Sequence, residues 1–434
     1  MFDTIFKEEK VEFMKIRTPH YYKDFKCIAG ACTDTCCAGW DVDVDAKAYK
    51  YYQSVKGEFG KRLKSVMNPD KEGGCTFTLS EHKRCPFLNE KNLCDLYTEL
   101  GEDKLCDTCA EFPRFIHIYG NEKEIGIAPS CKTAGELIFN FQGKLTFDEA
   151  EDGKPINQVN DIDGFLYYQL KKVRACAYAI IQNDTFSPDN VAVLLLDMAV
   201  KIQKVMDKEK DQAISGIVKK YSDETYLQHR LSQCIYNTIT IEADKKSKTY
   251  TNVLKFVRQF FAAFPDMEII NPDWNKYVHY YNCFINDFLK NSNGYKEYQK
   301  AYQSFDKYYQ DRSYEYKQLF MYYIYRYFLD AVYDYNILLK VKNAVVGYAV
   351  LKQLDMAAWH QNGGRLDKKE QIDIAHLYSR QFEHSYYNYE VYSKLFCKKR
   401  CYSVSNLLRL FCCKEWEWRH NKDLYACADG KENT

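Results

Sequence analysis

The N-terminal third of the chain is organised by the stretch CIAGACTDTCCAGW, which occupies residues 27–40. Its four cysteines are Cys27, Cys32, Cys36 and Cys37. Six more follow, so that ten of the chain's 18 cysteines lie in its first 131 residues. Such spacing lets several thiolates converge on one point, as soft metals and iron–sulfur clusters require. The stretch therefore predicts a small α+β domain whose elements fold around a metal.

The later cysteines of this region fall in short motifs: Cys85-Pro86-Phe87-Leu88, Leu93-Cys94, Cys106-Asp107-Thr108-Cys109 and Ser130-Cys131. Residues 106–109 form one zinc-type knuckle, but a second knuckle is missing and the adjacent pair at 36–37 fits a small tetrahedral ion poorly. An iron–sulfur cluster, of the 4Fe-4S type, tolerates such irregular spacing. Zinc and simple buried thiols stay open as alternatives. The candidate ligands are a subset of Cys27, Cys32, Cys36, Cys37, Cys85, Cys94, Cys106, Cys109 and Cys131.

The charge balance of the chain does not indicate a strongly charged binding partner. The chain has 61 basic and 60 acidic residues and a net charge of +1. This balance gives no reason to expect binding to nucleic acid or to an anionic membrane. The first ten residues have neither the basic n-region nor the apolar run of a signal peptide. We therefore expect a cytoplasmic protein, whose clustered thiols stay reduced and available for metal.

The chain divides near residues 148–164, an acidic segment that contains proline and glycine and predicts a domain boundary. We expect a cysteine-rich metal domain over residues 1–147 and a large all-helical domain over 165–434, which would bind substrate. Long helices are predicted at 191–207, 251–264, 314–339 and 369–395. The 38 tyrosines of the chain are expected to form the buried faces of such helices. The expected fold class is α+β and predominantly helical.

Two local elements are predicted between the last cysteine motifs. Residues 115–119 and 124–128 alternate around Gly120-Asn121 and predict a β-hairpin. Ser130 is a suitable N-cap for a helix from Cys131 to about Phe141.

The cysteine motifs, together with Thr18-Pro19-His20-Tyr21-Tyr22 and Phe112-Pro113-Arg114, resemble the flagellin lysine-N-methylase family. The resemblance covers roughly residues 15–140, and residues 378–384 (YSRQFEH) are the best matching segment beyond it. It implies a cytoplasmic methyltransferase that modifies surface lysines of flagellin, with S-adenosylmethionine as donor and a cysteine-bound iron–sulfur cluster. Two positions depart from the family pattern: Cys75 lies outside it, and Lys132 stands where proline is expected.

The binding site of the methyl donor has no clear sequence signature. A glycine-rich turn between a strand and a helix, typical of doubly wound methyltransferases, is missing from the sequence. The donor is therefore expected to bind elsewhere, with the cysteine domain as the candidate active site. Arg114 is a candidate for the donor carboxylate, and Glu383 and His384 are candidates for catalysis or substrate contact. The alternative is a redox or interaction module that binds iron–sulfur or zinc and transfers no methyl group; the sequence predicts no oligomeric state.

Overall fold

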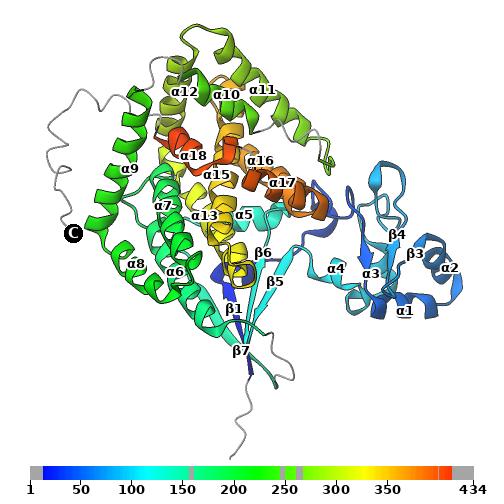
Figure 1. The fold of residues 1–434 in the computed structure, drawn as a ribbon. Helices are drawn as coiled ribbons and strands as arrows, with labels where there is room; N and C mark the ends of the chain where they lie inside the picture. The colour runs from blue at the N-terminus through cyan, green and yellow to red at the C-terminus, as the bar shows by residue number, and fades with distance from the viewer. Residues whose placement is uncertain (1–12, 156–160, 245–249, 261–266, 399, 413–434) are drawn as a thin grey trace, which may run out of the picture.

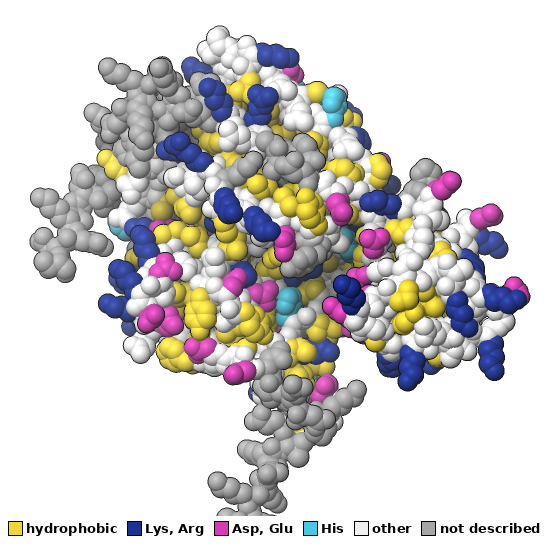
Figure 2. Space-filling view, turned by 45° about the vertical axis from the view of Figure 1, so that its right-hand side comes forward, with side chains coloured by type: hydrophobic (Ala, Val, Ile, Leu, Met, Phe, Trp, Pro, Cys, Tyr) yellow, Lys and Arg dark blue, Asp and Glu magenta, His cyan; other side chains and the backbone are white. Residues whose placement is uncertain are grey.

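The computed structural model describes residues 13–155, 161–244, 250–260, 267–398 and 400–412. Helices dominate this part of the chain, which confirms the prediction of a predominantly helical protein. A large helical body carries a small lobe at one side and a four-stranded sheet at its lower edge (Figure 1). In the space-filling view the lobe stands out from the body (Figure 2).

The helices of the body follow the sheet in the sequence. Within the described residues they are α6 (Gly164–Ile181), α7 (Pro188–Met206), α8 (Ile214–Tyr221), α9 (Glu224–Asp244), α10 (Tyr250–Gln259), α11 (Trp274–Lys290), α12 (Gly294–Tyr308), α13 (Tyr314–Tyr327), α14 (Ala331–Asp334), α15 (Ile337–Gln361), α16 (Lys368–Glu383), α17 (Tyr386–Lys398) and α18 (Val404–Phe411). Helix α15 is buried along almost its whole length and packs against α7, α11, α13 and α16. Burial on all sides of the helix places it at the centre of the helical body.

Tyrosines form much of the buried core of the body, as the sequence predicted. Tyr298, Tyr302 and Tyr316 are at most 2% exposed. Their hydroxyl groups donate to buried polar side chains; that of Tyr316 lies 2.6 Å from Asp355. A tyrosine core thus buries large rings while it keeps each polar end hydrogen-bonded.

The four-stranded sheet has the order β5-β6-β1-β7. Its strands are β1 (Phe13–Pro19), β5 (Arg114–Tyr119), β6 (Glu122–Ile127) and β7 (Phe147–Pro155). Strands β5 and β6 form the predicted antiparallel hairpin, with Ile116 opposite Ile125. The sheet is fixed to the body by a buried ion pair, in which Arg174 of α6 donates to Glu124 of β6 at 2.6 Å.

The lobe contains most of the N-terminal cysteines. It comprises α1 (Ala46–Ser54), α2 (Gly57–Val66), α3 (Asp95–Leu100) and α4 (Asp107–Glu111), with a small sheet of β2 (Asp43–Val44), β3 (Met67–Pro69) and β4 (Cys75–Phe77) in the order β2-β4-β3. Asp45 caps α1 by accepting the Ala48 amide at 2.9 Å. The lobe has its own hydrophobic core around Tyr52, Phe77 and Phe87, separate from the large core of the body.

The two cores divide the chain differently from the predicted boundary at 148–164. The large core takes residues from both sides of that segment, including Ile138 of α5 (Lys132–Asn140) and Leu170 of α6. Much of the acidic segment is strand β7, which pairs with β1. The segment is therefore an edge strand of the sheet rather than an irregular linker, and the part of the chain with a separate core is the lobe.

Three local predictions need correction. The helix after the hairpin begins at Lys132, and its N-cap is Cys131, whose backbone is extended. The predicted N-cap, Ser130, therefore lies one position too early. The helix predicted at 314–339 breaks after Tyr327 and again at Tyr335, whose φ of 54° is left-handed. The helix predicted at 369–395 is two helices, because the chain turns between α16 and α17.

Candidate functional site

The candidate site is centred on the cysteine loop of residues 27–37, which lies between the lobe and the body. The cysteines of the described residues are all free thiols. Cys85 and Cys106 are buried in the lobe, and Cys27 is exposed. The thiols of Cys36 and Cys37 lie 4.0 Å apart.

The arrangement of these thiols bears on the kind of metal that would fit. Within the described part of the chain, no three His, Cys, Asp or Glu side chains converge as the ligands of a single ion. A tetrahedral zinc ion requires four sulfurs at about 2.3 Å from one point. An iron–sulfur cluster is a larger object whose thiolates bind different iron atoms. Thiols are the ligand type that both kinds of centre use, and an iron–sulfur cluster in this region remains a prediction.

Two side chains of helix α16 bind Asp34 of the cysteine loop. His376 Nε2 lies 2.6 Å from the Asp34 carboxylate, and Arg380 Nη1 donates to its other oxygen at 2.9 Å. Arg380 also donates to the carbonyl of Thr35 at 3.1 Å and to that of Ala38. The side chains of His376 and Arg380 are 1% and 3% exposed. We call this set of contacts the Asp34 clasp; it fixes the loop between Cys32 and Cys36 to the helical body.

The clasp also acts on the thiols. Hydrogen bonding from Cys36, aided by Thr35 and the charges of Arg380 and Arg84, lowers the pKa of Cys37 to about 7 against the effect of burial. Burial raises the pKa of Cys85 to about 12. The Cys37 thiol therefore ionises at a lower pH than the Cys85 thiol, and near neutral pH it is the better ligand for a metal.

The two candidate catalytic residues of α16 lie in different surroundings. Glu383 accepts hydrogen bonds from Tyr327 at 2.7 Å and from Ser379, and Arg326 lies 3.5 Å away. The ring of His384 forms a cluster with those of Trp40 and Phe112, whose ring centres lie 5.0 Å and 5.1 Å from it and 6.2 Å from each other. The His384 contacts join the N-terminal part to the helical body, whereas those of Glu383 lie within the body. A catalytic role for either residue remains a prediction.

Arg114, the candidate for the donor carboxylate, lies at the start of β5. Its Nε donates to the Tyr22 hydroxyl at 3.0 Å, and its guanidinium lies 5.4 Å from the centre of the Phe25 ring. The structure thus places it against the 3-10 helix η1 (His20–Asp24). Its proposed contact with the donor remains a prediction.

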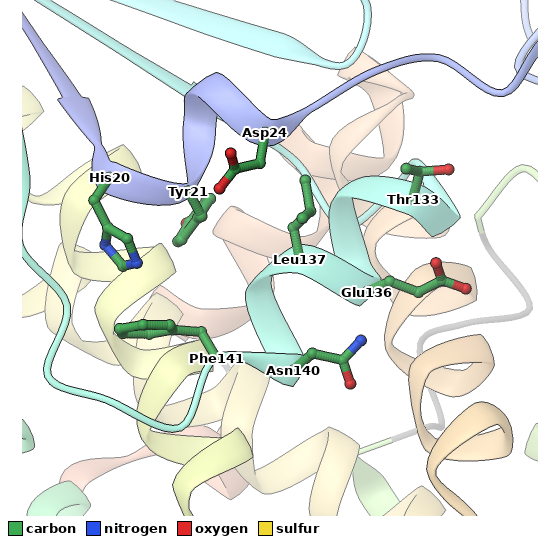
Figure 3. A pocket seen from close by; sticks show the side chains of 8 residues that line it. All are labelled: His20, Tyr21, Asp24, Thr133, Glu136, Leu137, Asn140 and Phe141. Carbon is green, nitrogen blue, oxygen red and sulfur yellow. The ribbon is translucent and has the colours of Figure 1, made fainter.

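A surface pocket of about 340 Å³ lies between η1 and α5 (Figure 3). The ring of His20 lies over that of Phe141, with ring centres 4.1 Å apart. Asp24 and Glu136 supply carboxylates, and the residues that line the pocket include neither lysine nor arginine. Helix α5, which lines one side of the pocket, begins directly after Cys131, one of the candidate ligands. Its negative charge and aromatic rings suit a cation.

Sequence reasoning missed the residues that assemble the site. Asp34 stands between Cys32 and Cys36, and Arg380 falls inside residues 378–384, the best matching segment of the C-terminal part. The signal was therefore present in both segments. The sequence did not show that Asp34 and Arg380, which are 346 positions apart, form a pair.

Comparison with known proteins identifies the helical part of the chain. A family model, described as the FliB lysine N-methylase C-terminal domain, matches residues 174–410, more than half of the chain. The chain belongs to the FliB lysine N-methylase family. The matched range includes α16 and both clasp residues that it carries, so the family domain is the part that holds the cysteine loop.

Curated relatives of this FliB-family chain come from Salmonella. Proteins named lysine-N-methylase in S. choleraesuis (strain SC-B67) and S. typhimurium (strain LT2) are each 22% identical over 275 residues, which is 62% of this chain. The match spans 66% of each relative, just under two thirds of its length. The flagellar biosynthetic protein FliU of S. muenchen is 28% identical over 139 residues, 31% of this chain and 82% of FliU. No solved structure matches the chain. Among the described residues, no helix is long and apolar enough to cross a membrane.

Proposed function

We propose that this protein is a protein-lysine N-methyltransferase that acts on flagellin, with S-adenosylmethionine as donor and an iron–sulfur centre held by the N-terminal cysteines. Membership of the FliB lysine N-methylase family supports the reaction, and the relatives' names support a flagellar substrate. The observation that carries the proposal is the Asp34 clasp, which ties the family domain to the cysteine loop.

The reaction forms a bond between the lysine Nζ and the methyl carbon while the bond from that carbon to the donor sulfur breaks. The lone pair of Nζ must be free, but a lysine ammonium has an ordinary pKa of about 10.4. The enzyme therefore has to bind the cation and accept its proton before transfer. We assign this binding step to the pocket between η1 and α5, where Asp24 and Glu136 attract an ammonium and the rings of His20 and Phe141 offer cation–π contacts.

Cys131, one of the candidate ligands, directly precedes α5, the helix that lines one side of that pocket. When bound, an iron–sulfur centre would supply iron that can engage the donor or a rigid wall that shapes its site. The chain's own part is to hold the loop in place through Asp34, Arg380 and His376. A buried ion pair of this kind keeps its geometry without solvent competition.

The test is co-expression of the chain with flagellin, followed by the intact mass of the flagellin. We expect a mass gain of one or more methyl groups, abolished when S-adenosylmethionine synthesis is limited. The double variant Asp24→Asn/Glu136→Gln should lower methylation at least tenfold at unchanged metal content. The matched control Glu149→Gln, a carboxylate 76% exposed on β7, should not. Unmodified flagellin beside folded, metal-loaded protein would refute the proposal.

A further inference from the structure

We propose that His20 accepts the proton of the target lysine, through the Nε2 atom of its imidazole. This inference rests on the proposed function and deepens it, because it names the proton acceptor that methyl transfer requires in the pocket between η1 and α5. His20, Asp24 and Glu136 all line this pocket. The two carboxylates attract a cation, whereas the imidazole offers a lone pair that can take a proton.

The chain holds the ring of His20 in a fixed position. His20 follows Pro19 at the start of η1, and its amide donates to the Thr146 carbonyl at 3.0 Å. The ring Nδ1 lies 3.4 Å from the same carbonyl oxygen. The ring also contacts Phe141, with ring centres 4.1 Å apart. Backbone and side-chain contacts with residues 141–146 therefore fix the imidazole at the wall of the pocket.

The contact with Thr146 also decides which ring nitrogen carries the hydrogen. A carbonyl oxygen only accepts hydrogen bonds, so Nδ1 is the donor in this contact. In a neutral imidazole the other nitrogen, Nε2, then has the free lone pair. Among the residues that the structure describes, none hydrogen-bonds to Nε2 of His20. Figure 3 shows one ring nitrogen of His20 on the side of the pocket. The lone pair is therefore available to a ligand that binds there.

The other titratable groups of the pocket are less suited to accept the proton. Asp24 and Glu136 are exposed, and an exposed carboxylate is a weaker base than an imidazole. Tyr21 is 5% exposed, and burial holds the pKa of its hydroxyl above the ordinary value. The carboxylates instead favour the positive charge, which lies on the lysine before the transfer and on the imidazole after it.

The step balances in atoms and electrons. The proton moves from the lysine Nζ to Nε2 of His20, and the freed lone pair of Nζ forms the bond to the methyl carbon. The bond between that carbon and the donor sulfur breaks, and its electron pair stays on the sulfur. The imidazolium then releases the proton to water, which reaches the pocket because it lies at the surface.

The rate of methyl transfer as a function of pH tests this role. The full chain, purified without oxygen, is mixed with flagellin and S-adenosylmethionine, and the mass of the flagellin is followed over time. His20→Phe keeps an aromatic ring beside Phe141 and removes the lone pair. We expect its rate to be about a hundredfold below that of wild type at pH 7. The rate should rise about tenfold per pH unit, because the lysine must now lose its proton to solvent, so the deficit shrinks by pH 9.

The matched control is His279→Phe, at an exposed position of α11, which should follow wild type at each pH. A His20→Phe rate equal to that of wild type at pH 7 would overturn the proposal. A deficit of the same size at every pH would also overturn it, because loss of binding or of structure acts in this way. His20→Gln, with circular dichroism and metal content compared with wild type, repeats the test if the phenylalanine variant does not fold.

A second measurement separates this inference from the proposed function. n-Butylammonium, which carries the charged end of a lysine side chain, is titrated into the full chain with isotope-labelled histidine, and the His20 signals are identified by their loss in His20→Phe. A saturable shift of these signals, absent in Asp24→Asn/Glu136→Gln, supports the assignment, and no shift overturns it. Unmodified flagellin beside such a shift would refute the proposed function while His20 still contacts the bound cation.

Discussion

His376 on helix α16 holds Asp34 of the cysteine loop with 2.6 Å between Nε2 and the carboxylate, across 342 positions of sequence. The other ring nitrogen of His376 lies 3.1 Å from the carbonyl of Pro129. One buried imidazole thus connects the first cysteine motif with the segment that leads to Cys131. This relationship makes the cysteine loop and the C-terminal helices one structural unit, and it is the basis of the first prediction.

Removal of the Asp34 carboxylate should loosen the cysteine loop. Asp34→Ala leaves Arg380, with a side chain 3% exposed, as a buried charge without its carboxylate partner. Loss of one partner of such a pair costs about 3 kcal/mol, which a urea titration would detect as a lower midpoint. The matched change Asp103→Ala, at a surface pair 75% exposed on the aspartate side, should leave the midpoint almost unchanged. Equal midpoints for Asp34→Ala and wild type would show that the clasp has no structural role.

Gly39 is where the lobe meets the backbone of the body. Its φ is +92°, and a Cβ there would lie 2.3 Å from the Ile270 carbonyl oxygen. Gly39→Ala should therefore separate the lobe from the body and speed tryptic cleavage between them. Gly57→Ala is the control, because its φ of +79° carries similar backbone strain of about 1 kcal/mol while nothing lies within 4 Å of the added carbon. Equal cleavage rates in the two variants would contradict a steric role for Gly39.

His384 should make the protein sensitive to mild acid. Burial, followed by the charges of Arg380 and Arg326, lowers the pKa of His384 from 6.5 to about 3. The unfolded chain then binds a proton between these values that the folded chain does not, so stability is full above about pH 6.5 and falls as the pH decreases. At pH 5 the loss is about 2 kcal/mol.

The variant His384→Phe keeps a ring packed against Trp40 and Phe112 and removes this titration. The free energy of unfolding, measured at pH 7 and pH 5, should therefore fall less in the variant than in wild type. His279→Phe, at an exposed position of α11, should behave as wild type. The same acid loss in His384→Phe as in wild type would assign the sensitivity to other groups.

Loss of the ion pair between Arg174 and Glu124 should lower the free energy of unfolding strongly. Both side chains are 1% exposed, and the pair joins the sheet to α6. Glu124→Gln leaves the guanidinium in the core without a negative partner and should lower the free energy of unfolding by about 3 kcal/mol. Glu149→Gln, on the edge strand β7 of the same sheet and 76% exposed, should have little effect in the same urea titration.

The sequence by itself determined the elements that local patterns specify. Alternation around Gly120-Asn121 predicted the β5–β6 hairpin, and helical periodicity predicted α7 and the tyrosine core of the body. The cysteine motifs identified the family and the part of the chain that carries the candidate ligands. These signals depend on residues a few positions apart, which a single sequence displays directly.

Only the tertiary structure decided how these parts combine. The segment predicted as a linker contains strand β7, which pairs with β1. The sequence did not show this pairing because β1 lies more than a hundred residues earlier in the chain. The Asp34 clasp, the packing of His384 against Trp40 and the contact of His376 with Pro129 join positions that no local pattern relates. Each depends on burial and on close approach of distant segments. Such contacts are set by the packing of the whole chain rather than by the spacing of its residues.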